Sequence, residues 1–303
     1  MRRASIDIGS NTTLLLVAEF RDGRWHELAN ESEVTSLGKK LDETKQFDSE
    51  SMSLTLSALE KFKNISQGFG ISADQILATA TEASRVALNA GDFYKKVLHE
   101  LGIKVQIINA KGEAFYTALG VCLFSILPEF VTVMDIGGAS TELINIKSEP
   151  MSVQTTISLP MGSVRCTEWL EQNSFDEKFA KTISKFDLSP FMTSHLICVA
   201  GSMTSLGSMI QGQKEYNAEE IDKSQISFET FKKFLSNLNH AKVDDLNRNY
   251  PFLGKRAKTI KAGALLGLKL GEALGVNTFE ISTRGLRYGT LFSGGIDYEF
   301  TRV

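Results

Sequence analysis

Short apolar runs alternate with amphipathic stretches along most of the chain. Residues 3–9 and 12–20 are two β-rich runs that meet at Gly9-Ser10-Asn11, a combination typical of a tight turn. Residues 49–68 instead carry apolar side chains at roughly helical spacing. Strands that alternate with helices in this way predict an α/β fold.

The same reading predicts the remaining elements. Further strands are expected at 74–80, 105–110, 153–158, 195–200 and 279–283, with a second hairpin over 131–146. Helices are expected at 92–101, 112–124, 164–172 and 176–186. The chain is expected to be mostly helical from Phe228 onward, including a helix at 262–275 and a helix at the C-terminal end. The small residues of VAGSMTSLG, 199–207, predict a loop.

One stretch of this pattern occurs twice. ASIDIGSNTTLLLVAEF, residues 4–20, and VTVMDIGGASTELINI, residues 131–146, align with an offset of 128 residues, the separation of Asp7 from Asp135. Identical residues then coincide at Asp-Ile-Gly and at one Thr and one Leu beyond the turn. The repeat indicates two duplicated domains.

The turn of each copy has the composition of a phosphate-binding loop. Glycine and small hydroxylated residues allow consecutive backbone N–H groups to converge on an anion. An Asp at the end of the preceding strand can hold a hydrated divalent cation, which bridges to phosphate oxygens. The alternative is a plain hairpin whose glycine has a positive φ angle.

Composition narrows the function classes. A chain of 303 residues that is 42% hydrophobic is long enough for two domains. A net charge of -3 argues against a nucleic-acid partner. The first residues lack the apolar core of a signal peptide and no apolar run is long enough to span a membrane, so we expect a cytoplasmic protein with no membrane partner. Neither the three cysteines nor the four histidines have metal-ligand spacing.

Seven stretches, taken in order, resemble the exopolyphosphatase and guanosine pentaphosphate phosphatase family of the actin-like ATPase superfamily. They are IDIGSNTTLL, ATEASRVALN, GEAFYTALGV, MDIGGASTEL, SLPMGSVRCTE, VAGSMTSLG and GLRYG. The resemblance implies the short, two-domain form: two duplicated actin-like (ribonuclease H-like) α/β domains with an interdomain cleft. We place them at 1–122 and 123–303, with packing of the terminal helix on the first domain left open.

The resemblance also implies an activity. The expected protein is a hydrolase that uses Mg²⁺ or Mn²⁺ to release terminal phosphate from polyphosphate, or the 5′ γ-phosphate from guanosine pentaphosphate. Polyphosphate and guanosine penta- or tetraphosphate are the expected ligands, and a homodimer is left open. The alternatives are a non-catalytic binder of polyphosphate or alarmone, and an ATPase or kinase of the same superfamily.

Site residues follow from the resemblance position by position. Glu113, the second Glu of the family's EEA motif, is the expected general base, and Glu142 is the second catalytic carboxylate. Asp135 and Asp7 are the expected metal ligands. The expected phosphate-binding residues are Gly9, Ser10, Asn11, Thr12, Arg85, Gly137, Gly138, Ala139, Ser140, Gly201 and Ser202.

Several of these residues have plainer alternatives. Glu113 would be favoured at a helix N-terminus without any function, and Glu142 and Arg85 could be solvated surface residues. Lys255, Lys258 and Lys261 are expected on one helical stripe, either as a solvated face or as a field that guides a polyanion.

The chain departs from the family at four positions. They are Leu14, Gly112 in place of the first Glu of EEA, Ala139 in place of a glycine, and Tyr288 in place of the Glu of GLREG. Ala139 would be costly only if the turn required a positive φ angle there. These departures bear on substrate preference and catalytic strength.

Overall fold

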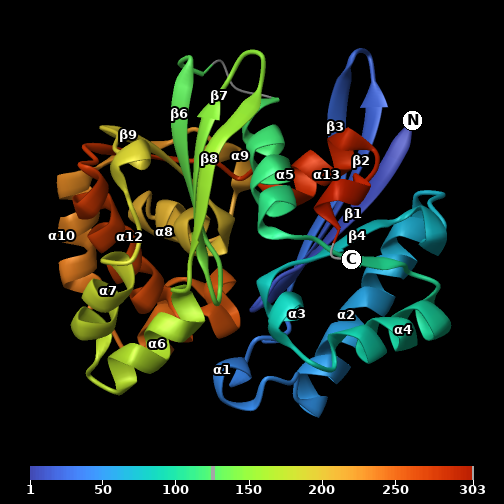
Figure 1. Cartoon of the computed structure of the whole chain (residues 1–303), viewed down its shortest axis with the longest axis horizontal. Helices are drawn as coiled ribbons and strands as arrows, with labels where there is room; N and C mark the ends of the chain where they lie inside the picture. The colour runs from blue at the N-terminus through green and yellow to red at the C-terminus, as the bar shows by residue number, and fades with distance from the viewer. Residues whose placement is uncertain (124–126, 302–303) are drawn as a thin grey trace. The chain divides into compact units, whose positions relative to one another are not determined.

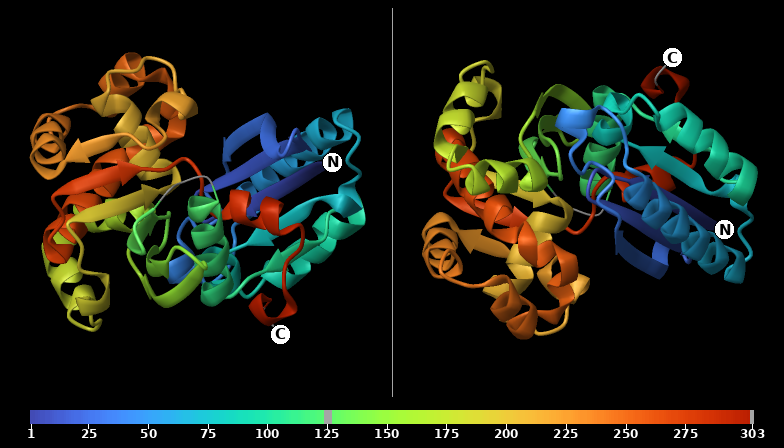
Figure 2. Two further views of the ribbon diagram at one scale, coloured as in Figure 1. Left: turned by 90° about the horizontal axis from the view of Figure 1, so that it is seen from above. Right: turned by 90° about the horizontal axis from the view of Figure 1, so that it is seen from below.

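The computed structural model describes residues 1–123 and 127–301, and the chain divides into two units (Figure 1). The first unit is Met1–Gly120 with Leu286–Val303, and the second is Val121–Gly285. The boundary expected between 122 and 123 lies two residues beyond this division. Residues 286–303, which the expected boundary assigned to the second domain, group with the first unit (Figure 2).

The first unit is built on a five-stranded sheet in the order β3-β2-β1-β4-β5. Its strands are β1 (Arg2–Ile8), β2 (Thr12–Arg21), β3 (Arg24–Val34), β4 (Leu77–Ala80) and β5 (Val105–Ile107). Its main helices are α2 (Ser49–Gly68), α4 (Ala90–Leu101), α5 (Ala110–Cys122) and α13 (Leu286–Ser293), with the short α1 (Leu41–Thr44), α3 (Glu82–Val86), η1 (Ala73–Gln75) and η4 (Tyr298–Phe300).

Alternation along β1 sends its side chains to opposite faces of this sheet. Ala4, Ile6 and Ile8 are buried in the core formed with α2 and α4. On the other face, the Ser5 hydroxyl donates a 2.6 Å hydrogen bond to the carbonyl oxygen of Arg287 in α13. Asp7 follows Ser5 on this second face and is therefore placed at the α13 side of the sheet.

The second unit has a six-stranded sheet in the order β10-β11-β9-β6-β7-β8. Its strands are β6 (Phe130–Ile136), β7 (Thr141–Lys147), β8 (Ser152–Leu159), β9 (His195–Val199), β10 (Gln225–Ser227) and β11 (Thr278–Ile281). Its helices are α6 (Ser163–Glu171), α7 (Phe175–Ile183), α8 (Ala200–Ile210), α9 (Ala218–Ile221), α10 (Phe228–Leu238), α11 (Val243–Asn249) and α12 (Ile260–Leu274), with η2 (Ser189–Phe191) and η3 (Pro251–Lys258).

The two sheets repeat one topology. In each, the first strand pairs antiparallel with the second and parallel with the fourth, as β1 does with β2 and β4 and as β6 does with β7 and β9. The second and third strands slip register between Val17 and Ala18 in one copy and between Asn145 and Ile146 in the other. These bulges are related by the same offset of 128 residues, so the repeat seen in the sequence is a repeat of structure.

Some predicted elements are wrong or incomplete. The strand β3 was not predicted, although shifting the predicted 153–158 strand back by the repeat offset would have found it. The predicted 199–207 loop is instead the start of α8, because Ala200, with φ 67°, turns the chain directly from β9 into the helix. The expected strand 74–80 begins as the short helix η1, and the expected strand 105–110 ends at Ile107. Phe124, expected in a helix, lies outside the described residues.

The other expectations that the coordinates address concern cysteines and membranes. Cys122, Cys166 and Cys198 form no disulfide. Among the described residues, no helix is both long and apolar enough to cross a bilayer.

We expect Gly289→Ala to lower the free energy of unfolding by about 1–3 kcal/mol or more, as overpacking does. A Cβ at Gly289 in α13 would overlap the backbone carbonyl of Tyr116 in α5. Gly295→Ala is the matched control, since a Cβ there meets nothing within 4 Å. Urea unfolding would measure both, and equal stabilities for the two variants would contradict this packing.

Candidate active site

The turn of the first hairpin is held by its carbonyl oxygens. The Gly9 N–H donates to the Thr12 carbonyl at 3.0 Å and closes the turn. The Ser10 carbonyl accepts from the Gly38 N–H at 2.7 Å. The Asn11 carbonyl accepts from the N–H groups of residues 35 and 36, both at 3.0 Å. The segment that follows β3 therefore fixes this turn.

The turn of the second hairpin is held in the same way. The Gly137 N–H donates to the Ser140 carbonyl at 3.0 Å. The start of α6 then supplies the donors: the Val164 N–H reaches the Gly138 carbonyl at 2.9 Å, and Arg165 Nη1 reaches the Ala139 carbonyl at 2.6 Å. The segment after the third strand is again the anchor.

Two backbone N–H groups of each turn take no part in these contacts. Within the described part of the chain, the backbone amides of Ser10, Asn11, Gly138 and Ala139 donate to no acceptor. Backbone donors that the protein does not satisfy suit an anionic ligand. The structure thus brings together, within each turn, the residues expected to bind phosphate.

No glycine of these two turns has a positive φ angle, so neither is the plain hairpin considered above. The role of Gly9 and Gly137 is close approach, because a Cβ would lie 3.1 Å and 3.2 Å from the carbonyls that close the turns. Ala139 is likewise not at positive φ. Its replacement of glycine therefore costs no backbone strain.

Gly162 is a site residue that the sequence analysis did not single out. A Cβ there would lie 2.5 Å from the carbonyl carbon and oxygen of Gly138. Only glycine lets the start of α6 approach the second turn this closely. The glycine of the SLPMGSVRCTE stretch is the sequence signal that could have identified it.

Asp135 and Glu142 are cross-strand neighbours, since β6 and β7 pair them directly. Glu142 is only 2% exposed, which excludes a solvated surface role, and its Oε1 accepts a 2.7 Å hydrogen bond from the Ser158 hydroxyl. Two carboxylates that face each other across a strand pair supply the hard oxygen ligands that a divalent cation prefers.

Glu113 is buried and paired with Arg85. Arg85 Nη1 lies 2.8 Å from Glu113 Oε2 and also donates to the Ile108 carbonyl at 2.9 Å. Burial raises the pKa of Glu113, and the charge and hydrogen bond of Arg85 oppose that rise. The Arg85 side chain is 18% exposed, so it is not a solvated helix residue.

Asp7 shares this acidic cluster. Its pKa is raised to about 7, mainly by burial and also by the nearby charge of Glu113, while the charge of Arg287 opposes the rise. Its Oδ1 is buried and accepts no hydrogen bond from the protein. Across the hairpin, Asp7 faces Leu14, where the second copy has Glu142. The family departure at Leu14 thus leaves the first hairpin with one carboxylate.

Gly201 and Ser202 lie in the first turn of α8. A Cβ at Gly201 would lie 2.6 Å from Arg256 Nη2, so the guanidinium covers this helix start. Arg256 Nη1 also donates to the Ser205 hydroxyl at 3.1 Å. Arg256 was missed because its KRAKTIK segment had drawn attention only to its lysines.

The three lysines of the expected stripe fall in two consecutive helices. Lys255 and Lys258 belong to η3, and Lys261 belongs to α12, which begins at Ile260. Lys261 Nζ donates to the Asn239 carbonyl at 3.0 Å. Residues three apart share a face of a 3₁₀ helix, so Lys255 and Lys258 keep the expected spacing within η3, and the stripe of three stays a prediction.

Two departures from the family have direct structural partners. A Cβ at Gly112 would lie 2.5 Å from Phe300 Cβ, so Phe300 occupies the space that a side chain at 112 would need. The Tyr288 hydroxyl donates to Glu27 Oε1 at 2.7 Å.

Comparison with known proteins supports these assignments at the level of family and fold. Residues 16–295 match the model of the Ppx/GppA phosphatase family. The chain is 28% identical over 316 aligned positions to a bifunctional 3-dehydroquinate synthase/phosphatase of Fusobacterium nucleatum, covering 96% of this chain and 46% of that protein. It is 32% identical over 213 positions to the guanosine-5′-triphosphate,3′-diphosphate pyrophosphatase of Vibrio cholerae, covering 66% and 41% respectively.

The chain spans less than half the length of these two relatives. Among solved structures, that of the Aquifex aeolicus Ppx/GppA family member superposes with a TM-score of 0.78 at 30% identity, covering 97% of each chain. An exopolyphosphatase structure from Cytophaga hutchinsonii has a TM-score of 0.84 at 23% identity, also covering 97% of each chain, and supports the fold. The two-domain actin-like fold is thus confirmed.

We expect the stability of the wild-type protein to fall relative to Asp7→Asn as the pH rises from about 4 to about 7. Because the pKa of Asp7 is raised in the folded state, folded Asp7 keeps its proton at pH values at which Asp7 of the unfolded chain has lost it. The stabilising contribution of Asp7 is therefore fully present below the pKa that Asp7 has in the unfolded chain, and it is lost as the pH rises through the pKa of the folded state. The difference should reach roughly 2–4 kcal/mol. Urea unfolding with EDTA at several pH values measures it.

Asp92→Asn, an exposed carboxylate on α4, is the control and should show no such trend. A pH-independent difference between wild type and Asp7→Asn would contradict the raised pKa.

Proposed function

The chain belongs to the Ppx/GppA phosphatase family, and we propose that it hydrolyses a terminal phosphoanhydride. The substrate is inorganic polyphosphate, guanosine pentaphosphate or both. The Vibrio cholerae relative is named for the second and the Cytophaga hutchinsonii structure for the first. The observation that carries the proposal is the buried Glu113, whose pKa is raised and whose Oε2 is fixed by Arg85.

In this proposal Glu113 is the general base. It takes a proton from the water that attacks the terminal phosphorus in line, and the rest of the substrate leaves as the phosphoanhydride bond breaks. Arg85 orients the carboxylate through Oε2, which leaves Oε1 to face the water. The unused amides of the two turns bind phosphate oxygens, as does the start of α8 with Gly201 and Ser202.

The residues present fit Mg²⁺ or Mn²⁺. Asp135 and Asp7 supply hard oxygen donors at the ends of the two first strands, and Glu142 lies opposite Asp135. The described residues contain no group of three Asp, Glu, His or Cys side chains arranged to hold a metal. In proteins Mg²⁺ binds through one or two carboxylates together with substrate phosphates. When bound, the cation would neutralise the developing phosphate charge.

The proposal also includes setting and assembly. A cytoplasmic location without a nucleic-acid or membrane partner is consistent with the net charge of -3 and the soluble ligands. A homodimer is the alternative to a monomer, and the mass in solution decides between them.

We expect Glu113→Gln to lower kcat by about 10²–10⁴-fold, the usual contribution of a general base. Phosphate release from long polyphosphate, guanosine pentaphosphate and ATP should be measured with purified protein and Mg²⁺. Glu60→Gln is the matched control, an exposed glutamate on α2 that should leave kcat unchanged.

Each outcome separates the alternatives. Release from ATP alone would favour an ATPase of the same superfamily. Tight binding of polyphosphate or guanosine pentaphosphate without release would favour a non-catalytic binder. Unchanged turnover in Glu113→Gln would reject the assignment of the base.

We expect EDTA to abolish phosphate release and Mg²⁺ or Mn²⁺ to restore it, because the paired carboxylates then regain their cation. Asp135→Asn should raise the Mg²⁺ concentration needed for half-maximal activity by roughly tenfold or more. Asp92→Asn serves again as the exposed control. Full activity in EDTA would contradict the metal requirement.

A further inference from the structure

Arg287 lies on α13 beside the acidic cluster of the first unit. Its carbonyl oxygen accepts from the Ser5 hydroxyl, and Arg3 Nη1 donates to the Leu291 and Phe292 carbonyls at 2.9 Å and 2.7 Å. Arg3 of β1 therefore contacts the C-terminal part of α13, and Ser5, the next residue on the same face of β1, contacts α13 nearer its start. The next residue in this series is Asp7, so the fold places Asp7 near the N-terminal end of α13, where Arg287 lies.

Helix α5 brings Glu113 to the same place. Gly289 of α13 packs directly against the backbone carbonyl of Tyr116. Glu113 precedes Tyr116 by three residues, so the two side chains share a face of α5. Asp7 from β1, Glu113 from α5 and Arg287 from α13 thus converge from three elements of one unit.

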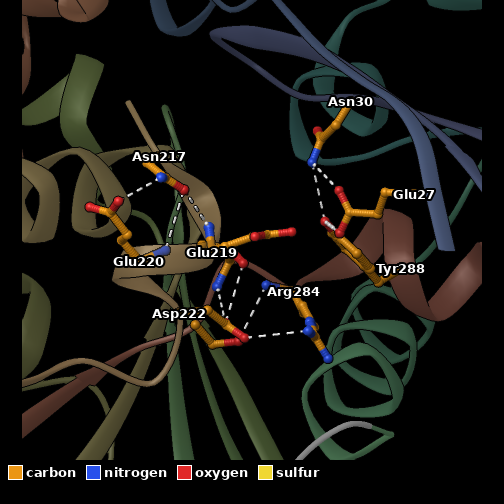
Figure 3. A network of polar contacts seen from close by, with 10 residues as sticks. Glu27, Asn30, Asn217, Glu219, Glu220, Asp222, Arg284 and Tyr288 are labelled. Atoms are coloured by element: carbon orange, nitrogen blue, oxygen red, sulfur yellow. Dashed lines mark hydrogen bonds and ion pairs between the residues drawn. The ribbon is translucent and has the colours of Figure 1, made fainter. Parts of the chain in front are cut away.

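The guanidinium of Arg287 is held in a defined orientation. Its Nη2 donates to Asn30 Oδ1 at 3.0 Å, and its Cζ lies 5.4 Å from the centroid of the Tyr288 ring. Asn30 Nδ2 in turn donates to Glu27 Oε2 at 3.0 Å and to the Tyr288 hydroxyl at 3.2 Å, and that hydroxyl donates to Glu27 (Figure 3). Three residues, Glu27, Asn30 and Tyr288, therefore form a closed network that supports one arginine.

This support does not use the donors that face inward. Arg287 Nε is buried and donates to no protein acceptor, and Asp7 Oδ1 is buried and accepts from no protein donor. The two residues form no ion pair with each other within 4.0 Å, and neither does Arg287 with Glu113. A buried donor and a buried acceptor that leave each other unsatisfied indicate a site built for a third group.

A phosphate group has the chemistry that Arg287 requires. Its oxygens accept from the planar fork of a guanidinium, and a strongly held arginine binds them better than a lysine can. The backbone amides of the first turn, which follows Asp7 on the same chain, require an acceptor of the same kind.

We propose that Arg287 is a further substrate-binding residue, which contacts phosphate oxygens of the substrate beside Glu113, and that Glu27, Asn30 and Tyr288 are its positioning residues. The inference rests on the proposed phosphoanhydride hydrolysis. It also gives a role to Tyr288: where the family motif has a Glu, this chain has a tyrosine whose hydroxyl binds a carboxylate supplied by Glu27 of β3.

Steady-state kinetics and direct binding test this inference together. Arg287→Gln should raise KM by about 10- to 100-fold, the range expected for charge-assisted hydrogen bonds to phosphate. In a Glu113→Gln background, calorimetry with polyphosphate of defined length should show a similar loss of affinity. Arg21→Gln, an exposed arginine of β2 in the same unit, is the matched control and should change neither quantity.

The positioning residues provide the second measurement. Asn30→Ala and Tyr288→Phe leave Arg287 in place but remove its support, so KM should rise about threefold to tenfold. Asn30 is exposed, and its variant decides the matter if Arg287→Gln does not fold. The polyphosphate affinity of Asn30→Ala should fall while its thermal unfolding stays close to wild type.

The outcomes separate this inference from the proposed function. Wild-type hydrolysis with unchanged KM and affinity in Arg287→Gln, or in Asn30→Ala where the first does not fold, would overturn the role of Arg287 alone. Failure of the wild type to hydrolyse polyphosphate or guanosine pentaphosphate would reject the proposed function. A stability loss in Arg287→Gln without any change in affinity would show a purely structural arginine and would also overturn the inference.

Discussion

The carbonyl oxygens of Ser10, Asn11, Gly138 and Ala139 are engaged within the protein, so these residues have their backbone N–H groups to offer a ligand, and the proposed site depends on this constraint. In both units the segment after the third strand provides the donors that hold the turn, through residues 35–38 in one and residues 163–165 in the other. The backbone, not the side chains, then defines what binds. This explains why turns of different sequence, GSNT and GGAS, can serve the same purpose, and why Ala139 is tolerated. The positions that require one residue type are instead the glycines at which another backbone segment approaches too closely for a Cβ, such as Gly162.

The repeat, the hairpins and the carboxylates at their ends could be predicted because each depends on local alternation and turn composition. The strand β3 escaped prediction because its residues are only partly buried and its apolar alternation is weak. The residues of helix α8 predict a loop because the small residues that allow close helix packing are also typical of turns. Arg287 lies in the GLRYG stretch and Arg256 in KRAKTIK, but neither stretch predicts the role of its arginine, since each side chain acquires its place from a segment distant in the chain. Their neighbours, Ser205 for one and Asn30 for the other, are set by the tertiary fold.

At two of the positions that depart from the family motif, Gly112 and Tyr288, the residue present contacts a partner from a distant part of the chain. Gly112 makes room for Phe300 of η4, which packs on α5 through ring contacts with Phe115 and Tyr116. Tyr288 replaces an acidic side chain but binds one from β3. The contact of Phe300 helps to hold α5, which carries Glu113, and the contact of Tyr288 helps to hold α13, which carries Arg287. Departure from a motif is therefore weak evidence for lost activity when the substituted position has a defined packing or hydrogen-bond partner in the fold.

The pairing of Glu113 with Arg85 resolves two opposing requirements on a general base. A buried carboxyl without a partner would remain protonated at neutral pH and could not accept a proton, whereas a carboxylate held by a two-pronged arginine contact would be too weak a base. Arg85 Nη1 divides its hydrogen bonds between Glu113 Oε2 and the Ile108 carbonyl, so its fork does not close on the carboxylate. Burial raises the pKa of Glu113 and this limited contact opposes the rise. The backbone carbonyl at the end of β5 thus helps to set the basicity of Glu113, because it takes part of the donor capacity that would otherwise lower that basicity.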